Sequence, residues 1–409
     1  MASSPISPSQ PDPNREWAVL HTSFVLIGVI TTLLGPILPS FSHRWLLNDA
    51  QAGFFFTCQY FFSTLGVVLT SVLLPRFGFS KVIAGGFVSF FVGFAFLGLG
   101  PWFVSAFLLG VIGLGYGLAN PAINLRATQL PSRNTAAAVT FLNFSWSVGS
   151  VLCPFVVGTL LPKLHLRGLS LLLGFLSLVL VLLHYSLPGG RDPAGVVSTT
   201  HALEDWLAHL RLPQAMPLLA LYFLYVGVEV ALGGWVASFE KRMPGMSAIT
   251  LVIAPSVFYG ALLLGRGVAP IVLRCASQIV VSVCGLSLAT FGSSIIVVSS
   301  TPRSLYTGAA IAGLGLAAQY PIFVTWLVEI FRRDSSWIGA LFFGAAGLGG
   351  AAIPWLVGIT SSTTGSLRAG LFIPLGISLI MIFLVLRARP HSAAVQPTGS
   401  FREALGKSG

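Results

Sequence analysis

The 409-residue chain is strongly apolar and basic: hydrophobic residues make up 55% of it, Asp, Glu, Lys and Arg together 8%, and the net charge is +11. Because soluble domains carry about a quarter of their residues charged, this composition and a mean hydropathy of +0.88 exclude a soluble protein and favour a lipid-exposed surface. The basic residues fall in short segments between apolar runs, which argues against nucleic acid as a partner.

Twelve apolar runs are long enough to cross a bilayer, for which about 20 residues suffice. The first six predicted spans are 17–41, 50–74, 81–99, 102–129, 135–162 and 168–186. The second six are 214–239, 248–272, 276–298, 303–330, 336–359 and 366–387. We therefore expect an all-α integral membrane protein with two six-helix bundles, 17–187 and 214–388, a cytoplasmic linker at 188–213, and disordered cytoplasmic ends at 1–16 and 389–409.

The distribution of Lys and Arg predicts the orientation, because cytoplasmic loops carry an excess of these residues. With the N-terminus inside, fifteen of the 22 fall on the cytoplasmic side and seven on the other. We therefore expect a multi-pass protein of the inner (plasma) membrane with both termini in the cytoplasm.

The sequence gives no sign of a metal site, a cofactor or catalysis. The four cysteines, Cys58, Cys153, Cys275 and Cys284, share no metal-ligand spacing. The spans carry no nucleophile beside a His or carboxylate partner. We expect neither an enzyme nor a bound metal or cofactor.

An internal repeat with an offset of 200 positions relates the two sets of spans. Residues 113–121 (GLGYGLANP) match residues 313–321 (GLGLAAQYP). In the next span of each set, Gly149, Pro154 and Gly158 match Gly349, Pro354 and Gly358. Six-helix units repeated in one orientation predict two bundles related by an axis along the membrane normal.

Glu229 is the acidic residue in the middle of the seventh predicted span. An ionised carboxylate there costs about 2.5–3.5 kcal/mol on insertion scales, and binding a proton would remove the charge. We therefore predict that Glu229 couples transport to protons, with binding of a substrate hydroxyl, or a purely structural role in fastening the bundle, as the alternatives.

Other polar and aromatic residues inside the spans predict a solute site in a central cavity. Amide side chains both donate and accept hydrogen bonds, as a polyhydroxylated ligand requires, and aromatic rings offer flat apolar faces. Each of these residues could instead bridge two helices. The candidate substrate-binding residues are Thr32, Gln59, Asn120, Asn124, Asn143, Trp146, Trp235, Gln319 and Tyr320.

Charged residues near the predicted cytoplasmic ends of spans are candidate gating residues. Arg76 and Lys81 lie in the loop after the second span, and Arg266 and Arg274 lie near the matching loop of the second half. Arg126 and Glu329 lie towards the ends of the fourth and tenth spans. The predicted gating set is Arg76, Lys81, Arg126, Arg274 and Glu329. Anchoring of helix ends in water is the alternative role.

From 17 to 387 the chain resembles the major facilitator superfamily. The loop at 71–81 is similar to that family's motif between helices two and three, although Ser71, Pro75 and Phe79 replace its usual Gly, Asp and basic residue. Residues 225–235 and the Gly-rich stretch ending at Pro321 resemble the fucose/hexose:proton symporter group. That group uses acidic residues on helices one and four, which this chain lacks.

The resemblance implies alternating access about a midplane site with a sugar as cargo. We therefore expect a monomeric secondary transporter of a small neutral solute, a monosaccharide, with proton coupling that rests on Glu229 or is absent. A facilitative sugar uniporter and an exporter of drugs or lipids on the same fold are the alternatives. Competition by hexoses against lipophilic cations discriminates between sugar transport and drug export.

Overall fold

The computed structural model describes residues 13–131, 135–186, 213–246, 253–331 and 335–388. In this part of the chain, eleven helical segments are long and apolar enough to cross a membrane. One of them, α6, covers both the fifth and the sixth predicted spans and bends at His165, where φ is 54° and ψ is 174°. The other predicted spans each correspond to one apolar helical segment, which confirms an all-helical membrane fold.

The helices of residues 13–186, here called the N-terminal bundle, are α1 (Pro13–Thr32), α2 (Leu34–Trp45), α3 (Asp49–Phe77), α4 (Phe79–Phe96), α5 (Trp102–Gln129) and α6 (Thr135–Ser186). The helices of residues 215–388, the C-terminal bundle, are α8 (Ala215–Lys241), α9 (Ala254–Cys275), α10 (Gln278–Val298), α11 (Pro302–Leu316), α12 (Gln319–Phe331), α13 (Ser335–Thr364) and α14 (Leu367–Ala388). Because α1 begins at Pro13, residues 13–16 are helical rather than disordered. The predicted disorder of 1–12 and 389–409 and most of the predicted linker fall outside the described residues.

The repeat found in the sequence corresponds to repeated helix crossings. A Cβ on Gly86 of α4 would meet the Gly115 carbonyl oxygen of α5 at 2.7 Å, and a Cβ on Gly285 of α10 would meet the Gly315 oxygen of α11 at the same distance. Only glycine allows backbones to approach so closely. The α4–α5 crossing therefore recurs as α10–α11.

The matched glycines Gly149 and Gly349 make a second pair of equivalent crossings. A Cβ on Gly149 of α6 would clash with the carbonyl oxygen of Val25 in α1. A Cβ on Gly349 of α13 would clash with the carbonyl oxygen of Phe223 in α8. Two sequence matches at one offset thus serve the same packing purpose in each bundle.

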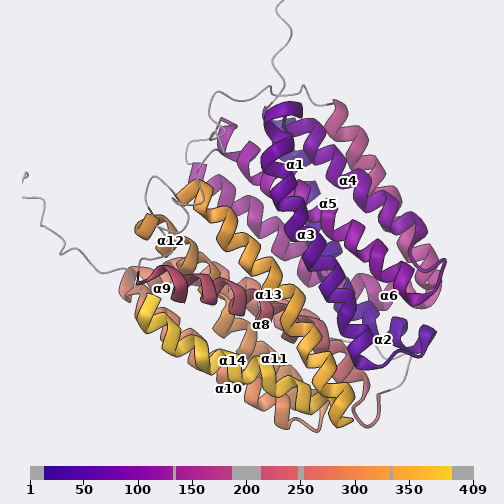
Figure 1. Ribbon diagram of the computed structural model, residues 1–409, viewed down its shortest axis with the longest axis vertical. Helices are drawn as coiled ribbons and strands as arrows, with labels where there is room; N and C mark the ends of the chain where they lie inside the picture. The colour runs from indigo at the N-terminus through magenta and orange to yellow at the C-terminus, as the bar shows by residue number, and fades with distance from the viewer. Residues whose placement is uncertain (1–12, 132–134, 187–212, 247–252, 332–334, 389–409) are drawn as a thin grey trace, which may run out of the picture.

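The two bundles meet along α3 and α13, which run side by side (Figure 1), and along α6–α9 and α2–α8. The start of α3, called here the Asp49 end of the molecule, holds several of the hydrogen bonds that join the bundles. The Ala50 N–H donates to Ser362 Oγ at 2.8 Å, and Thr57 Oγ1 donates to the Ala351 carbonyl oxygen at 2.9 Å. The bundles are therefore fastened together at the Asp49 end.

Candidate functional site

An arginine and a glutamate face each other between α8 and α9. Arg266 Nη2 lies 3.6 Å from Glu229 Oε2, and the two side chains are 24% and 13% exposed. Arg266 Nη2 also donates to the Tyr225 hydroxyl at 3.5 Å. Tyr225 and Glu229 lie one helical turn apart on α8, so both point to the same side of that helix. The charge of Glu229 is therefore partnered by a cation from the neighbouring helix.

Arg266 also connects the two bundles. Its guanidinium carbon lies 5.5 Å from the centre of the Trp146 ring, which belongs to α6 of the N-terminal bundle. The Trp146 Nε1–H donates to Thr31 Oγ1 at 3.1 Å, and Gln59 Nε2 donates to the Thr31 carbonyl oxygen at 3.4 Å. A continuous series of contacts thus runs from Gln59 through Trp146 and Arg266 to Glu229, and we call these residues the central cluster.

Tyrosines from both bundles lie around the central cluster. The Tyr225 and Tyr320 rings are 5.9 Å apart and inclined by 31°, and the Tyr222 ring lies 6.0 Å from that of Tyr320. Tyr116 of α5 and Tyr259 of α9 lie within electrostatic range of both Glu229 and Arg266. The cluster therefore combines a neutralised charge pair, flat aromatic faces and phenol groups that can donate or accept hydrogen bonds.

A second acid on α8, Glu240, is held quite differently from Glu229. It is fully buried, and its carboxylate accepts from the N–H of Ile253 at 3.1 Å, the N–H of Ala254 at 2.9 Å and the Tyr306 hydroxyl at 2.6 Å. These donors satisfy the charge at the N-terminus of α9, where helix amides lack partners. Glu240 therefore fastens α8 to α9, whereas the Glu229 carboxylate lies 3.6 Å from the nearest Arg266 nitrogen.

Three of the predicted substrate residues are asparagines of α5 and α6 whose side chains are linked by hydrogen bonds. Asn124 Nδ2 donates to the carbonyl oxygen of Asn120 at 3.0 Å, and Asn143 Nδ2 donates to Asn124 Oδ1 at 2.9 Å. Asn143 is exposed and lies three residues before Trp146 on α6. The structure thus brings these asparagines together in the N-terminal bundle. Through Asn143 they lie one turn of α6 away from Trp146 of the central cluster.

Three other predicted substrate residues make contacts within or between helices. Trp235 is buried and donates to the Pro354 carbonyl oxygen at 2.9 Å. Gln319 donates to the Gly315 oxygen at 3.1 Å and to the Ser282 oxygen of α10 at 3.4 Å, and Thr32 donates to the Gly28 oxygen at 2.8 Å. None of these hydrogen bonds involves the Glu229–Arg266 pair, so the role of these residues in binding stays a prediction.

The predicted gating residues divide into one paired arginine and four residues at the protein surface. Arg126 of α5 binds Glu16 of α1 through both carboxylate oxygens, at 2.6 and 3.1 Å, and both side chains are largely buried. Glu329 is exposed and accepts from Gln278 Nε2 at 3.5 Å. Arg76, Lys81 and Arg274 are exposed. The Arg126 pair lies within one bundle, where it fastens α1 to α5.

Replacing Arg126 with lysine is expected to lower the free energy of unfolding by about 1 kcal/mol, because lysine keeps the charge but loses the two-pronged hydrogen bonding. Thermal unfolding in detergent measures this change. Arg76→Lys, an exposed position on α3, is the matched control and is expected to leave the unfolding unchanged. An Arg126→Lys protein as stable as the wild type would contradict the stabilising role of this pair.

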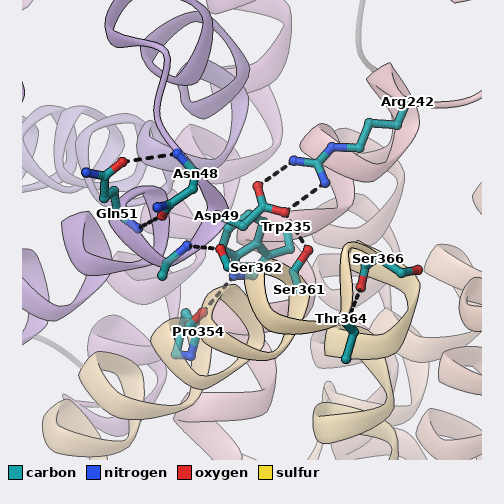
Figure 2. A network of polar contacts seen from close by, with 11 residues as sticks. Asn48, Asp49, Gln51, Trp235, Arg242, Pro354, Ser361, Ser362, Thr364 and Ser366 are labelled. Atoms are coloured by element: carbon teal, nitrogen blue, oxygen red, sulfur yellow. Dashed lines mark hydrogen bonds and ion pairs between the residues drawn. The ribbon is translucent and has the colours of Figure 1, made fainter.

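A polar network at the Asp49 end joins α3 to two helices of the C-terminal bundle (Figure 2). The Asp49 carboxylate accepts from Arg242 Nη1 at 2.8 Å and from Arg242 Nη2 at 2.5 Å. It also accepts from the Ser361 hydroxyl at the end of α13. Separation of the bundles at this end must break these bonds, so Asp49 and Arg242 form a latch. No residue of this latch was among the sequence-derived candidates.

Arg242→Gln is expected to increase the open population at the Asp49 end about two- to fivefold, because a partly exposed ion pair contributes about 0.5–1 kcal/mol. The distance between spin labels at positions 46 and 364 reports this opening, in a chain without its four native cysteines. Arg44→Gln is the matched control, since Arg44 donates to the Gly98 oxygen within one bundle. Equal distance distributions in Arg242→Gln and the wild type would contradict the latch.

The placement of Arg266 corrects the sequence analysis, which put this residue near a cytoplasmic loop. Arg266 lies within α9 and faces Glu229. The signal was present, because position 266 falls inside the predicted span 248–272, where an arginine is as unusual as a glutamate. Apart from Tyr320, the tyrosines of the site were also missed, since an aromatic residue inside a span is unremarkable without a known partner.

Comparison with known proteins identifies the fold independently of the site. The sequence profile of the Major Facilitator Superfamily matches residues 20–282, which is more than half of the chain. Sodium-dependent glucose transporter 1A of Mus musculus is 21% identical over 410 residues, covering 89% of this chain and 94% of that protein. Sodium-dependent glucose transporter 1 of Homo sapiens is 30% identical over 165 residues, but this match covers only 40% of the chain and 31% of the relative.

Solved structures give the same architecture. A bacterial homologue of the human lysosomal transporter Spinster has a TM-score of 0.76 and 15% identity, with 93% of this chain and 97% of the other covered. The E. coli fucose:proton symporter FucP has a TM-score of 0.64 and 16% identity, with coverages of 92% and 99%. At these identities the likeness concerns the fold.

Proposed function

Because the chain belongs to the Major Facilitator Superfamily, we propose that it moves a neutral monosaccharide across the membrane by alternating access, coupled to protons through Glu229. The chain is a multi-pass membrane transporter rather than an enzyme. The observation that carries the proposal is the central cluster, in which Trp146 of one bundle lies against the Glu229–Arg266 pair of the other. A solute bound there touches both bundles, as alternating access requires.

The chemistry of the central cluster supports a neutral polar solute. The opposite charges of Glu229 and Arg266 cancel, so the site has no net charge to attract an ionic substrate. Tyrosine hydroxyls and the nearby amides supply donors and acceptors for hydroxyl groups, and the aromatic rings supply flat apolar faces. The names of the glucose-transporting relatives point to the same class of solute. A lipophilic drug would not use the hydrogen-bond donors and acceptors of these hydroxyl and amide groups.

Proton coupling through Glu229 is proposed because its carboxylate is held more loosely than that of Glu240. The nearest Arg266 nitrogen is 3.6 Å away, whereas the Glu240 carboxylate accepts three hydrogen bonds of 3.1 Å or less. Protonation of Glu229 would release Arg266 and so alter the contact with Trp146 of the other bundle. Sodium, named in the relatives, is the rival coupling ion.

The proposal extends to the placement of the chain in the cell. We infer two bundles with boundaries near 17–187 and 214–388, both termini in the cytoplasm, and a monomer in the inner (plasma) membrane. The excess of Lys and Arg on one side of the predicted spans supports this orientation. The Asp49 end then faces outwards.

Thermal stability of the purified full chain tests the substrate class. A ligand that binds the folded state raises the melting temperature with its concentration. We expect D-glucose or another hexose to raise it selectively over pentoses and over lipophilic cations such as tetraphenylphosphonium. A rise with lipophilic cations alone would replace the sugar proposal with drug export.

A further inference from the structure

Arg266 has hydrogen-bonding capacity that the described residues leave unused. A guanidinium carries five N–H donors, and Arg266 Nη2 lies 3.5 Å from the Tyr225 hydroxyl and 3.6 Å from Glu229 Oε2. The Arg266 Nε is buried and has no hydrogen-bond partner among the described residues. A buried donor without an acceptor is destabilising, and the described part of the chain supplies no acceptor for Arg266 Nε.

The chain itself contains the matched comparison. Arg126 engages both oxygens of Glu16, at 2.6 and 3.1 Å, as a tightly paired arginine does. The 3.6 Å between Arg266 and Glu229 exceeds the usual length of about 2.7–2.9 Å for a charged N–H···O bond. Both arginines have a glutamate within reach, but only Arg126 closes on its partner. The loose pair can therefore open to admit a small polar group.

The unpaired Nε and the loosely engaged Nη2 lie along one edge of the guanidinium. A planar fork of this kind matches two oxygen atoms side by side. A carboxylate would fit the fork, but Glu229 beside it would repel a second negative charge. Two adjacent hydroxyl groups avoid this repulsion. A hydroxyl can also accept from the guanidinium and donate to the carboxylate at the same time.

We propose that Arg266 is the specificity-determining residue of the site and binds two vicinal hydroxyl oxygens, one of them inserted between its guanidinium and the Glu229 carboxylate. This inference rests on the proposed sugar transport and names the part of the sugar that is recognised. Trp146 contacts the guanidinium from the other bundle, the Tyr225 hydroxyl lies at Nη2, and the Tyr320 ring lies 5.9 Å from the Tyr225 ring. Binding of the diol thus replaces the loose Arg266–Glu229 contact by hydrogen bonds from Arg266 to the sugar and from the sugar to Glu229.

Affinities for D-glucose and its 2-, 3-, 4- and 6-deoxy analogues test the proposal, measured by calorimetry on the purified full chain. Loss of one hydroxyl of the bound pair is expected to weaken binding to the wild type about tenfold or more, because the partner group is left unpaired. Equal affinity for all four analogues would overturn the proposal without any variant.

Arg266→Lys keeps the charge but removes the fork, so it is expected to weaken glucose binding and to reduce the discrimination among analogues to about twofold or less. Arg303→Lys, an exposed position at the start of α11, is the control and is expected to bind as the wild type does. If Arg266→Lys does not fold, Arg266→Gln takes its place. If the Arg266 variant binds sugar and discriminates among the analogues as the wild type does, the role of Arg266 is overturned but the proposed function is not. If the wild type binds none of these sugars, the proposed function is overturned as well.

Discussion

Replacing Glu229 with glutamine is expected to abolish sugar accumulation driven by a proton gradient. With one proton per sugar, a gradient of one pH unit supports an accumulation of about tenfold in the wild type. Glutamine keeps the shape of the side chain but cannot exchange a proton, so the variant should only equilibrate the sugar across the membrane. Uptake of labelled D-glucose into proteoliposomes with an imposed pH gradient measures the ratio.

Two controls make the Glu229→Gln result specific to coupling. Exchange of labelled for unlabelled sugar without a gradient should continue in the variant, because exchange needs the binding site but no net proton movement. Glu229→Asp retains a carboxylate and should recover part of the accumulation. A Glu229→Gln protein that still concentrates sugar would eliminate Glu229 as the coupling residue, while leaving sugar transport itself intact.

Replacing Gly349 with alanine is expected to destabilise the C-terminal bundle strongly. The added Cβ would clash with the carbonyl oxygen of Phe223. This is a backbone atom, which cannot move away by a change of rotamer as a flexible side chain can. Overpacking costs about 1–3 kcal/mol, and a backbone obstacle places this substitution at the upper end of the range. The melting temperature and the yield of monodisperse protein in detergent measure the loss.

Gly376→Ala is the matched control for this substitution. Gly376 lies within α14, and a Cβ there would have no heavy atom within 4 Å. Alanine is the better helix former by about 1 kcal/mol, so this variant should be as stable as the wild type or slightly more so. The repeat further predicts that Gly149→Ala resembles Gly349→Ala. Equal stability of the Gly349 and Gly376 variants would contradict the close α8–α13 crossing.

The sequence was sufficient to predict the spans and the repeat. Spans are encoded locally, since each needs an unbroken apolar run, and ten of the predicted spans correspond one to one to helical segments of the structure. The fifth and sixth spans are the two parts of α6, which are separated at His165, where the backbone is not helical. The repeated Gly149 and Gly349 were recognisable because a close crossing tolerates no other residue.

The partners within the site could not be predicted in the same way. Position along the chain gives the depth of a residue in the membrane but not the neighbouring helix that it faces. Trp235 and Glu229 lie on the same helix, yet Trp235 packs against Phe56 and Pro354 while Glu229 faces Arg266. Asp49 and Arg242 are far apart in the sequence, at 49 and 242, and meet because α13 packs against both α3 and α8.

Transport by the wild-type chain under separate ion gradients tests the central claim most directly. A proton gradient, a sodium gradient or no gradient is imposed on separate samples of proteoliposomes that contain the purified protein. Uptake of labelled D-glucose is followed in each sample. We predict that the proton gradient drives accumulation above equilibrium and that the sodium gradient does not. Accumulation with sodium alone would contradict proton coupling through Glu229, and the absence of glucose uptake under all three conditions would contradict D-glucose as a substrate.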